Sequence, residues 1–119
     1  MKYIELKQVT TRKGEAQRLN YATQIEFIVG EAMDGPQGQR QGFDRETNRR
    51  ALRILDRLEA LPEGAMILAL EDADHTFLVG RVNSFIWPFA DRAFEDFCES
   101  IEKAPSEEPE PLQASTATN

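Results

Sequence analysis

Hydrophobic and polar residues follow two different periods in this chain. Residues 3–9, YIELKQV, place apolar and polar side chains on opposite faces, which is the two-residue period of a half-buried strand. Residues 66–70, MILAL, form a short apolar run between a turn and a group of acids, which is typical of a strand buried on both faces. We predict that these two segments pair in a small sheet.

Most of the remaining chain has the three- and four-residue spacing of amphipathic helices. Residues 20–33 are predicted to form a helix capped by Asn20, although their β-branched residues would also suit a strand. Residues 44–61 give the clearest helix, because Asp44 is a suitable N-cap and an apolar stripe follows it. The stripe consists of Ala51, Leu52, Leu55, Leu58 and Leu61, with Ile54 at its edge. The intervening loop 34–42 is rich in glycine, and we expect no regular element there.

Two further helices follow the 66–70 strand. One begins near Asp72 and ends at Trp87-Pro88, because proline disfavours helical conformation in the residue before it. The other begins near Asp91 and carries apolar residues on one face as far as Ile101. These patterns predict a predominantly helical α+β fold in which three to four helices pack on a small two-stranded sheet.

The segment 71–75, EDADH, contains three acids and the only histidine of the chain. Asp72, Asp74 and His75 could form a metal centre or an acid/base pair, but acids at a cap and in a first turn are also what a helix N-terminus favours. One histidine and one cysteine exclude a His-rich zinc site, whereas a carboxylate site for Mg²⁺ stays open. We predict a helix start with an Asp cap, and no catalytic, metal-binding or cofactor-binding residue.

Cys98, the only cysteine, falls on the apolar side of the last helix, which favours a buried structural thiol over a nucleophile. A single cysteine allows no intrachain disulfide and fits a reducing compartment. The N-terminus lacks the apolar run of a signal peptide, and no segment approaches the ~20 apolar residues that span a bilayer. We therefore expect a soluble, cytoplasmic protein.

Charge is unevenly distributed along the chain. The formal net charge is −7 and the isoelectric point is about 4.7, which opposes sequence-independent binding of nucleic acid and points to protein partners. Residues 39–58 nevertheless contain six arginines against three acids, whereas residues 71–110 contain eleven acids against three bases. The molecule is therefore expected to be electrically two-sided.

An arginine row, Arg45, Arg49, Arg53 and Arg57, repeats every four residues along the 44–61 helix. The row is interpreted first as a solvated face paired with acidic helices of the same chain. It could instead bind an acidic protein surface, because the planar guanidinium suits carboxylates at interfaces. A nucleic-acid interface is the third reading, since a helix after a glycine-containing loop resembles a recognition helix.

Four aromatic residues crowd the connection between the last two predicted helices. We call Phe85, Trp87, Phe89 and Phe94 the aromatic joint. It is interpreted as a core hinge or as an exposed patch that anchors a partner, because Trp and Phe dominate binding hot spots. The candidate partner-binding residues are Arg45, Arg49, Arg53, Arg57, Trp87 and Phe89.

The C-terminal segment 105–119 is rich in Pro, Glu, Ser and Thr, with Leu112 as its one large apolar residue. It cannot bury enough apolar surface to offset the entropy of ordering. We therefore predict one compact domain over residues 1–104 and a disordered acidic tail over residues 105–119.

The run RRALRILDRLEALPEG followed by LALEDADHTFLVGRVNSFIWPFADRAFEDFCESIEKA resembles small accessory and assembly proteins of tailed bacteriophages and prophages. The resemblance covers residues 44–104, about half of the chain, and contains no catalytic motif. It implies a phage accessory role in the host cytoplasm or on the virion, with a phage structural protein or a host protein as partner.

The sequence as a whole therefore predicts a non-enzymatic, chaperone-like protein–protein interaction factor, because it has no phosphate loop, nucleophile elbow or metal-ligand set. The alternative is a nucleic-acid-associated regulator that uses the helix 44–61. An enzyme built on EDADH is the third reading.

Overall fold

Four helices make up about half of the described part of the chain. The computed structural model describes residues 1–31, 33–34 and 40–108. The helices in these residues are α1 (Tyr21–Gly30), α2 (Arg45–Ala60), α3 (Asp72–Ser84) and α4 (Arg92–Glu102). The predicted α+β class with a predominance of helix is confirmed, and the 20–33 segment is helical over α1.

The strands pair two by two. β1 (Lys2–Glu5) and β6 (Ile67–Leu70) are antiparallel, with Ile4 opposite Leu68, so the predicted pairing of these segments is confirmed. β2 (Gln8–Thr11) and β3 (Gly14–Asn20) form a hairpin. β4 (Met33–Asp34) pairs with β5 (Arg40–Gln41).

The strand predictions need three corrections. The expected single strand over residues 3–9 is interrupted after Glu5, because the chain leaves β6 there and β2 turns to pair with β3. β3 was not predicted, since its sequence, GEAQRLN, has neither a clear apolar period nor β-branched residues. The glycine-rich loop 34–42 contains a short ladder at its ends, and residues 35–39 lie outside the described residues.

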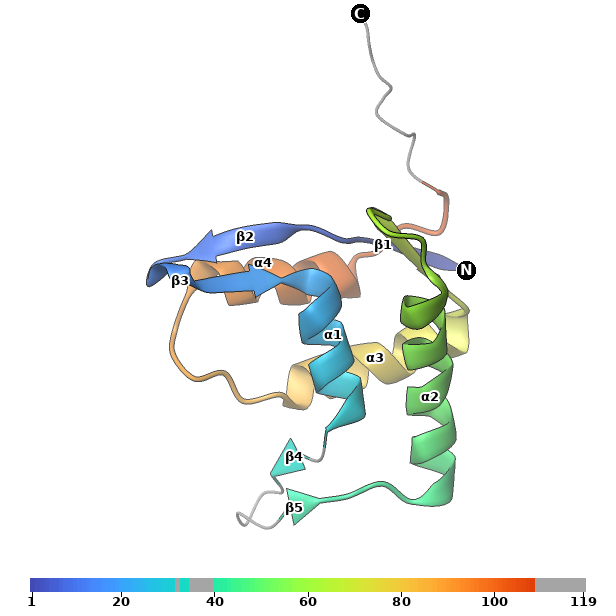
Figure 1. Cartoon of the computed structure of the whole chain (residues 1–119). Helices are drawn as coiled ribbons and strands as arrows, with labels where there is room; N and C mark the ends of the chain where they lie inside the picture. Colours follow the sequence, from blue (N-terminus) through green and yellow to red (C-terminus); the bar gives the residue numbers. More distant parts are fainter. Residues whose placement is uncertain (32, 35–39, 109–119) are drawn as a thin grey trace, which may run out of the picture.

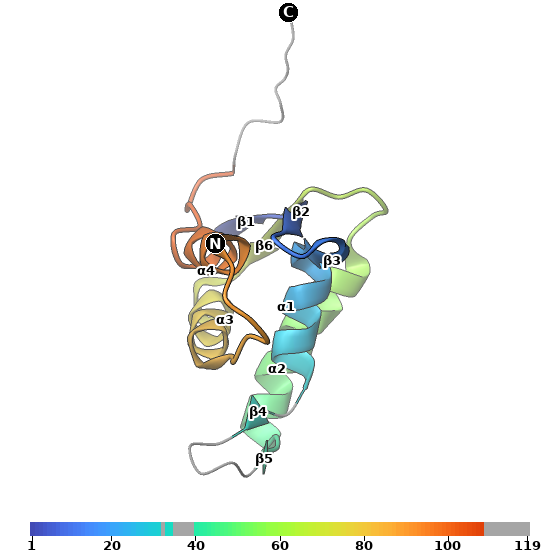
Figure 2. The same ribbon diagram turned by 90° about the vertical axis from the view of Figure 1, so that its left-hand side faces the viewer.

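The elements form a sheet-capped bundle. α1 and α2 run antiparallel side by side, and the β2–β3 hairpin lies against α4 (Figure 1). Figure 2 shows α3 and α4 together on one side of the molecule and α1 and α2 on the other, with the β1–β6 pair between their upper ends. The connection between α3 and α4 passes beneath the hairpin, and this connection contains most of the aromatic joint.

One core holds these elements together. A fully buried apolar side chain comes from each of β1, α1, α2, β6, α3 and α4, namely Ile4, Ile25, Ile54, Leu68, Leu78 and Phe97. Burial of that kind contributes roughly 1.5–3 kcal/mol per large side chain. The core therefore fixes the position of all four helices relative to the β1–β6 pair.

The buried faces of α2 and β6 differ from the predicted ones. On α2, Ile54 is fully buried and Leu52 is 44% exposed, because α2 packs against α1 on one side and α3 and β6 on the other. On β6, Leu68 and Leu70 are buried, whereas Ile67 and Ala69 are half-buried. The prediction that residues 66–70 are buried on both faces is wrong, since one face of β1–β6 remains only partly covered.

Three of the predicted helix starts are confirmed by their caps. Asn20, Asp44 and Asp91 each accept a hydrogen bond from a backbone N–H of the first turn that follows. α3 differs, because Glu71 occupies its N-cap position without a side-chain cap bond and Asp72 is the first helical residue. The Asp cap expected for this helix is therefore wrong.

α3 also ends earlier than predicted. Its last residue is Ser84, and Phe85 is already extended at φ −75° and ψ 138°, with its N–H bonded to the carbonyl of Val82. The chain thus leaves the helix three residues before Trp87. Because α3 ends at Ser84, Phe85 and Trp87 do not belong to the apolar face of this helix, and their rings contact each other in the connection that follows.

The start of the predicted tail lies against the domain. The N–H of Tyr3 donates to the carbonyl of Pro105 at 3.0 Å, and Lys2 Nζ donates to Ser106 Oγ at 2.8 Å. Residues 109–119 lie outside the described residues, so the disorder expected of them stays a prediction. Within the part of the chain that is described, no helix is long and apolar enough to cross a membrane.

Candidate functional site

Two polar side chains of EDADH, those of Asp74 and His75, are buried and form hydrogen bonds to other helices. Asp74 is 3% exposed and His75 is 8% exposed, although both belong to the first turn of α3. Asp74 Oδ1 accepts a hydrogen bond from Arg53 Nε at 3.0 Å, and His75 Nε2–H donates to the carbonyl of Ile101 at 2.7 Å. These bonds fasten α3 to α2 and to the end of α4.

The exposed acids of the same segment face other groups. Asp72 lies 2.8 Å from the N-terminal ammonium of Met1, and this hydrogen bond is the main reason that the pKa of Asp72 lies below its usual value. Glu71 lies 3.4 Å from Arg57 Nη2. Across the described residues, no three His, Cys, Asp or Glu side chains converge to hold a metal ion.

The arginine row is divided into two halves. Arg53 pairs with Asp74, and Arg57 Nη1 donates to the carbonyl of Ala69 at 3.0 Å, at the outer edge of β6. Arg49 and Arg45, one and two turns before Arg53, are exposed and form no ion pair with any residue that the structure describes. The first half of the row therefore has no ion-pair partner among the described residues, whereas the second half bonds to α3 and β6.

Trp87 is the centre of the aromatic joint. Its ring stacks on Phe94 with centroids 4.4 Å apart and an angle of 12° between the planes. Phe85 and Phe97 approach the same ring edge-on, at 4.8 and 5.8 Å. Trp87 remains half-buried, so the joint is partly a core hinge between α3 and α4 and partly surface.

The apolar surface extends from the joint onto α1. Phe27 is 51% exposed, and its ring lies 5.8 Å from that of Phe85. Ile86, between Phe85 and Trp87, is 73% exposed. We call Phe27, Phe85, Ile86, Trp87 and Phe89 the aromatic surface. All of them except Ile86 line a groove of about 210 Å³ between β3, α1 and the joint.

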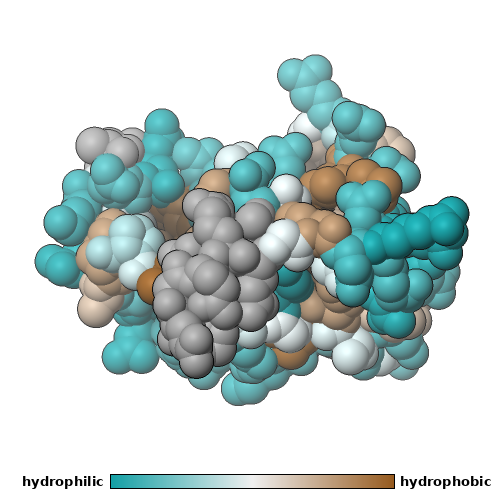
Figure 3. Space-filling model, turned by 90° about the horizontal axis from the view of Figure 1, so that it is seen from below, coloured by the Kyte–Doolittle hydropathy of each residue, from teal (hydrophilic) through white to brown (hydrophobic). Residues whose placement is uncertain are grey.

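Figure 3 shows the underside of the molecule, where hydrophobic atoms reach the surface on both sides of the grey atoms. Elsewhere in this view hydrophilic side chains predominate. Phe27 is in ring contact with Phe85, and Ile86 follows Phe85 in the chain. Exposed apolar side chains that form a contiguous patch mark binding surfaces more often than isolated ones do.

A basic turn borders the aromatic surface. Lys13 Nζ lies 5.0 Å from the centroid of the Phe89 ring, and Arg12 Cζ lies 5.6 Å from it. The carboxylate of Asp91 accepts hydrogen bonds from the N–H groups of Arg12 at 2.6 Å and Ala93 at 2.9 Å, and these bonds lower its pKa. The β2–β3 turn is thus fastened to the joint, and Phe89 lies beneath two cations.

Cys98 is half-buried, so the expected buried thiol is only partly realised. Burial raises the pKa of the thiol, and the negative charges of Glu95 and Glu102 raise it further. The thiol therefore remains protonated near neutral pH, which disfavours nucleophilic chemistry at this position.

Trp87 and Phe89 are predicted candidate-site residues, whereas Phe27, Ile86 and the basic turn are not. Phe27 could have been found, because it falls opposite the stripe formed by Ile25, Ile28 and Val29 and must therefore face outward. No local sequence pattern could predict that the β2–β3 turn lies close to Phe89, since the two are far apart in the chain.

No family model matches this chain, and comparisons with curated proteins and with solved structures also found no match.

Proposed function

We propose that this chain is a non-enzymatic protein-binding factor that binds its partner through the aromatic surface. The observation that carries the proposal is the exposure of Phe27 and Ile86 beside the packed rings of the joint. Half-exposed aromatic and aliphatic side chains over a rigid base are the usual anchors of protein interfaces, because they bury much area at little entropic cost.

The size of the groove supports a protein partner over a small molecule. Its volume of about 210 Å³ lies below the roughly 300–1,000 Å³ of clefts that enclose small ligands. A groove of this size accommodates a few side chains of a partner. Lys13 and Arg12 at its border favour a partner segment that carries acids beside its apolar residues.

The resemblance of residues 44–104 to tailed-phage accessory proteins supports a role in phage assembly, in the host cytoplasm or on the virion. The partner is then a phage structural protein or a host protein. Arg45 and Arg49, which form no ion pair with a described residue, favour a second candidate, a nucleic-acid-associated regulator, because exposed arginines on one helix face suit phosphates. The net charge of −7 works against that candidate.

The experiment compares variants of the tagged protein during co-purification from its native host, followed by mass spectrometry. Phe27→Ser with Ile86→Ser should abolish capture of the partner. Leu52→Ser with Met66→Ser is the matched control, since these side chains are also exposed, at 44% and 69%, but lie on α2 and before β6. Equal capture by both double variants would contradict the proposal.

The second candidate is tested with duplex DNA at physiological salt. The wild type should not bind it. Binding that is lost in Arg45→Glu with Arg49→Glu would instead favour the regulator.

A further inference from the structure

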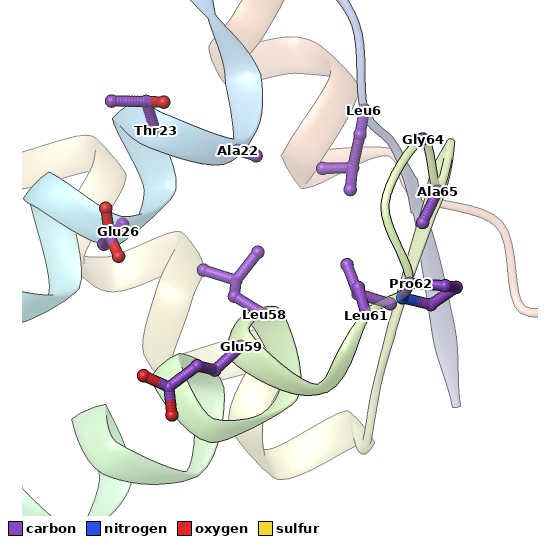
Figure 4. Close-up of a pocket in the computed structure, with 10 residues that line it drawn as sticks. All are labelled: Leu6, Ala22, Thr23, Glu26, Leu58, Glu59, Leu61, Pro62, Gly64 and Ala65. Atoms are coloured by element: carbon purple, nitrogen blue, oxygen red, sulfur yellow. The ribbon is translucent and has the colours of Figure 1, made fainter.

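A second groove lies away from the aromatic surface, between α1, the end of α2 and the turn that leads to β6. Its volume is about 270 Å³. Figure 4 shows the side chains of Leu6, Leu58 and Leu61 directed into the space between these elements. Ala22 of α1 and Ala65 of the turn add to the apolar part of the lining, and Thr23, Glu26 and Glu59 supply polar atoms.

The lining is held by the fold. Leu6 is 9% exposed and belongs to the core, and its N–H donates to the carbonyl of Met66 at 2.8 Å. The turn is closed by a hydrogen bond from the N–H of Ala65 to the carbonyl of Pro62 at 3.1 Å, with Gly64 at φ 82°, a conformation that favours glycine. The groove is therefore preformed.

Carboxylates border this apolar space. Glu26 of α1 and Glu59 of α2 line the groove, and their side chains lie toward the left of Figure 4. Both are exposed, as are Asp56, one turn before Glu59, and Glu63 in the turn. None of the four forms an ion pair with a residue that the structure describes. Lys7, which follows Leu6, lies 3.7 Å from Glu5.

We infer that this groove binds a basic amphipathic segment of a protein partner, with an apolar side chain in the groove and Lys or Arg beside Glu26 and Glu59. Apolar side chains bordered by acids that pair with no described residue are complementary to a helix that has a leucine face flanked by cations. The inference is independent of the proposed function, because the aromatic surface has a basic border and the two surfaces share no residue.

The test uses a fluorescein-labelled amphipathic peptide of about 16 residues, built from Leu, Lys and Ala. Fluorescence anisotropy should show saturable binding to the full chain. Glu26→Gln with Glu59→Gln should weaken it about five- to ten-fold, because two attractive charges are lost. Glu99→Gln with Glu102→Gln changes the net charge equally on α4 and should leave the affinity nearly unchanged.

Three results would overturn the inference. The first is no binding to the wild type, and the second is an equal loss in both double variants, which would mean attraction by net charge alone. The third is equal binding of a peptide in which Glu replaces every Lys. Besides these three peptide results, sedimentation of the free chain gives a fourth that would overturn the inference. Self-association that is lost only in Glu26→Gln with Glu59→Gln would mean that a second copy, and not a basic segment, occupies the groove.

Discussion

The two ends of helix α3 place opposite kinds of side chain in opposite environments. At its N-terminal end, Asp74 and His75 are buried and bonded to α2 and α4. At its C-terminal end the chain continues into Phe85 and Ile86, and Ile86 is 73% exposed. Polar groups that are hydrogen-bonded inside the protein stabilise the fold. Exposed apolar groups can instead stabilise a complex, because a partner that covers them removes apolar surface from water.

This difference between the two ends also predicts which substitutions change the stability of the fold and which change partner binding. Substitutions at the polar end should change the free energy of unfolding, because they remove bonds between helices. Substitutions of the exposed residues at the apolar end should change partner binding with little effect on unfolding. Trp87 belongs to both groups, since one face of its ring is packed on Phe94.

The largest expected effect is that of Trp87→Ala. It should lower the free energy of unfolding by about 2–4 kcal/mol, because the stack on Phe94 and the edge contacts with Phe85 and Phe97 are lost. Ile86→Ala, its neighbour, should change that free energy by less than about 0.5 kcal/mol. Urea unfolding of both variants is the measurement, and similar losses in the two would mean that Ile86 is core.

The placement of the core explains which predictions succeed. Helix positions follow from local spacing and caps, and for that reason Asn20, Asp44 and Asp91 mark the starts of α1, α2 and α4 correctly. The buried face of a helix depends on what packs against it. Ile54 was expected at the edge of its stripe and is fully buried, since α2 contacts α1, α3 and β6.

The candidate site was less predictable than the fold. Trp87 and Phe89 could be proposed from composition, but whether they are exposed depends on the early end of α3 at Ser84. Arg53 and Arg57 have the same spacing as Arg45 and Arg49, yet among the described residues only Arg53 and Arg57 have bonding partners, Asp74 and Ala69. Spacing cannot distinguish them, because those partners come from elements more than ten residues away.

The next largest effect concerns the bond between α2 and α3. Asp74→Ala should lower the free energy of unfolding by about 1.5–3 kcal/mol, because a charge-assisted hydrogen bond is lost. Arg53→Met should lower it by at least as much, since it leaves a buried carboxylate without its partner.

Arg49→Met is the control for this pair and should be neutral. Calorimetry or urea unfolding gives the comparison. A neutral Arg53→Met would mean that the bond between Arg53 and Asp74 does not stabilise the fold.

The smallest expected effect is a pH dependence at the joint. The pKa of Asp91 is lowered from 3.8 by the bonds from Arg12 and Ala93, so its carboxylate stabilises the fold above that value. The contribution is lost as the pH falls through the depressed pKa. Asp91→Asn should therefore lower Tm near neutral pH, and the difference from the wild type should narrow below pH 3.8. A difference in Tm that stays constant with pH would mean that the charge of Asp91 does not stabilise the fold.

The most direct test of the account is amide hydrogen exchange of the chain alone and in complex with the partner that it captures. Residues 85–90 and the segment of α1 around Phe27 should gain protection in the complex, because a partner covers the aromatic surface. The amides of residues 72–76 should exchange at the same rate in both states, because Asp74 and His75 already have their partners inside the fold. Protection that appears at residues 72–76 and not at 85–90 would contradict the account.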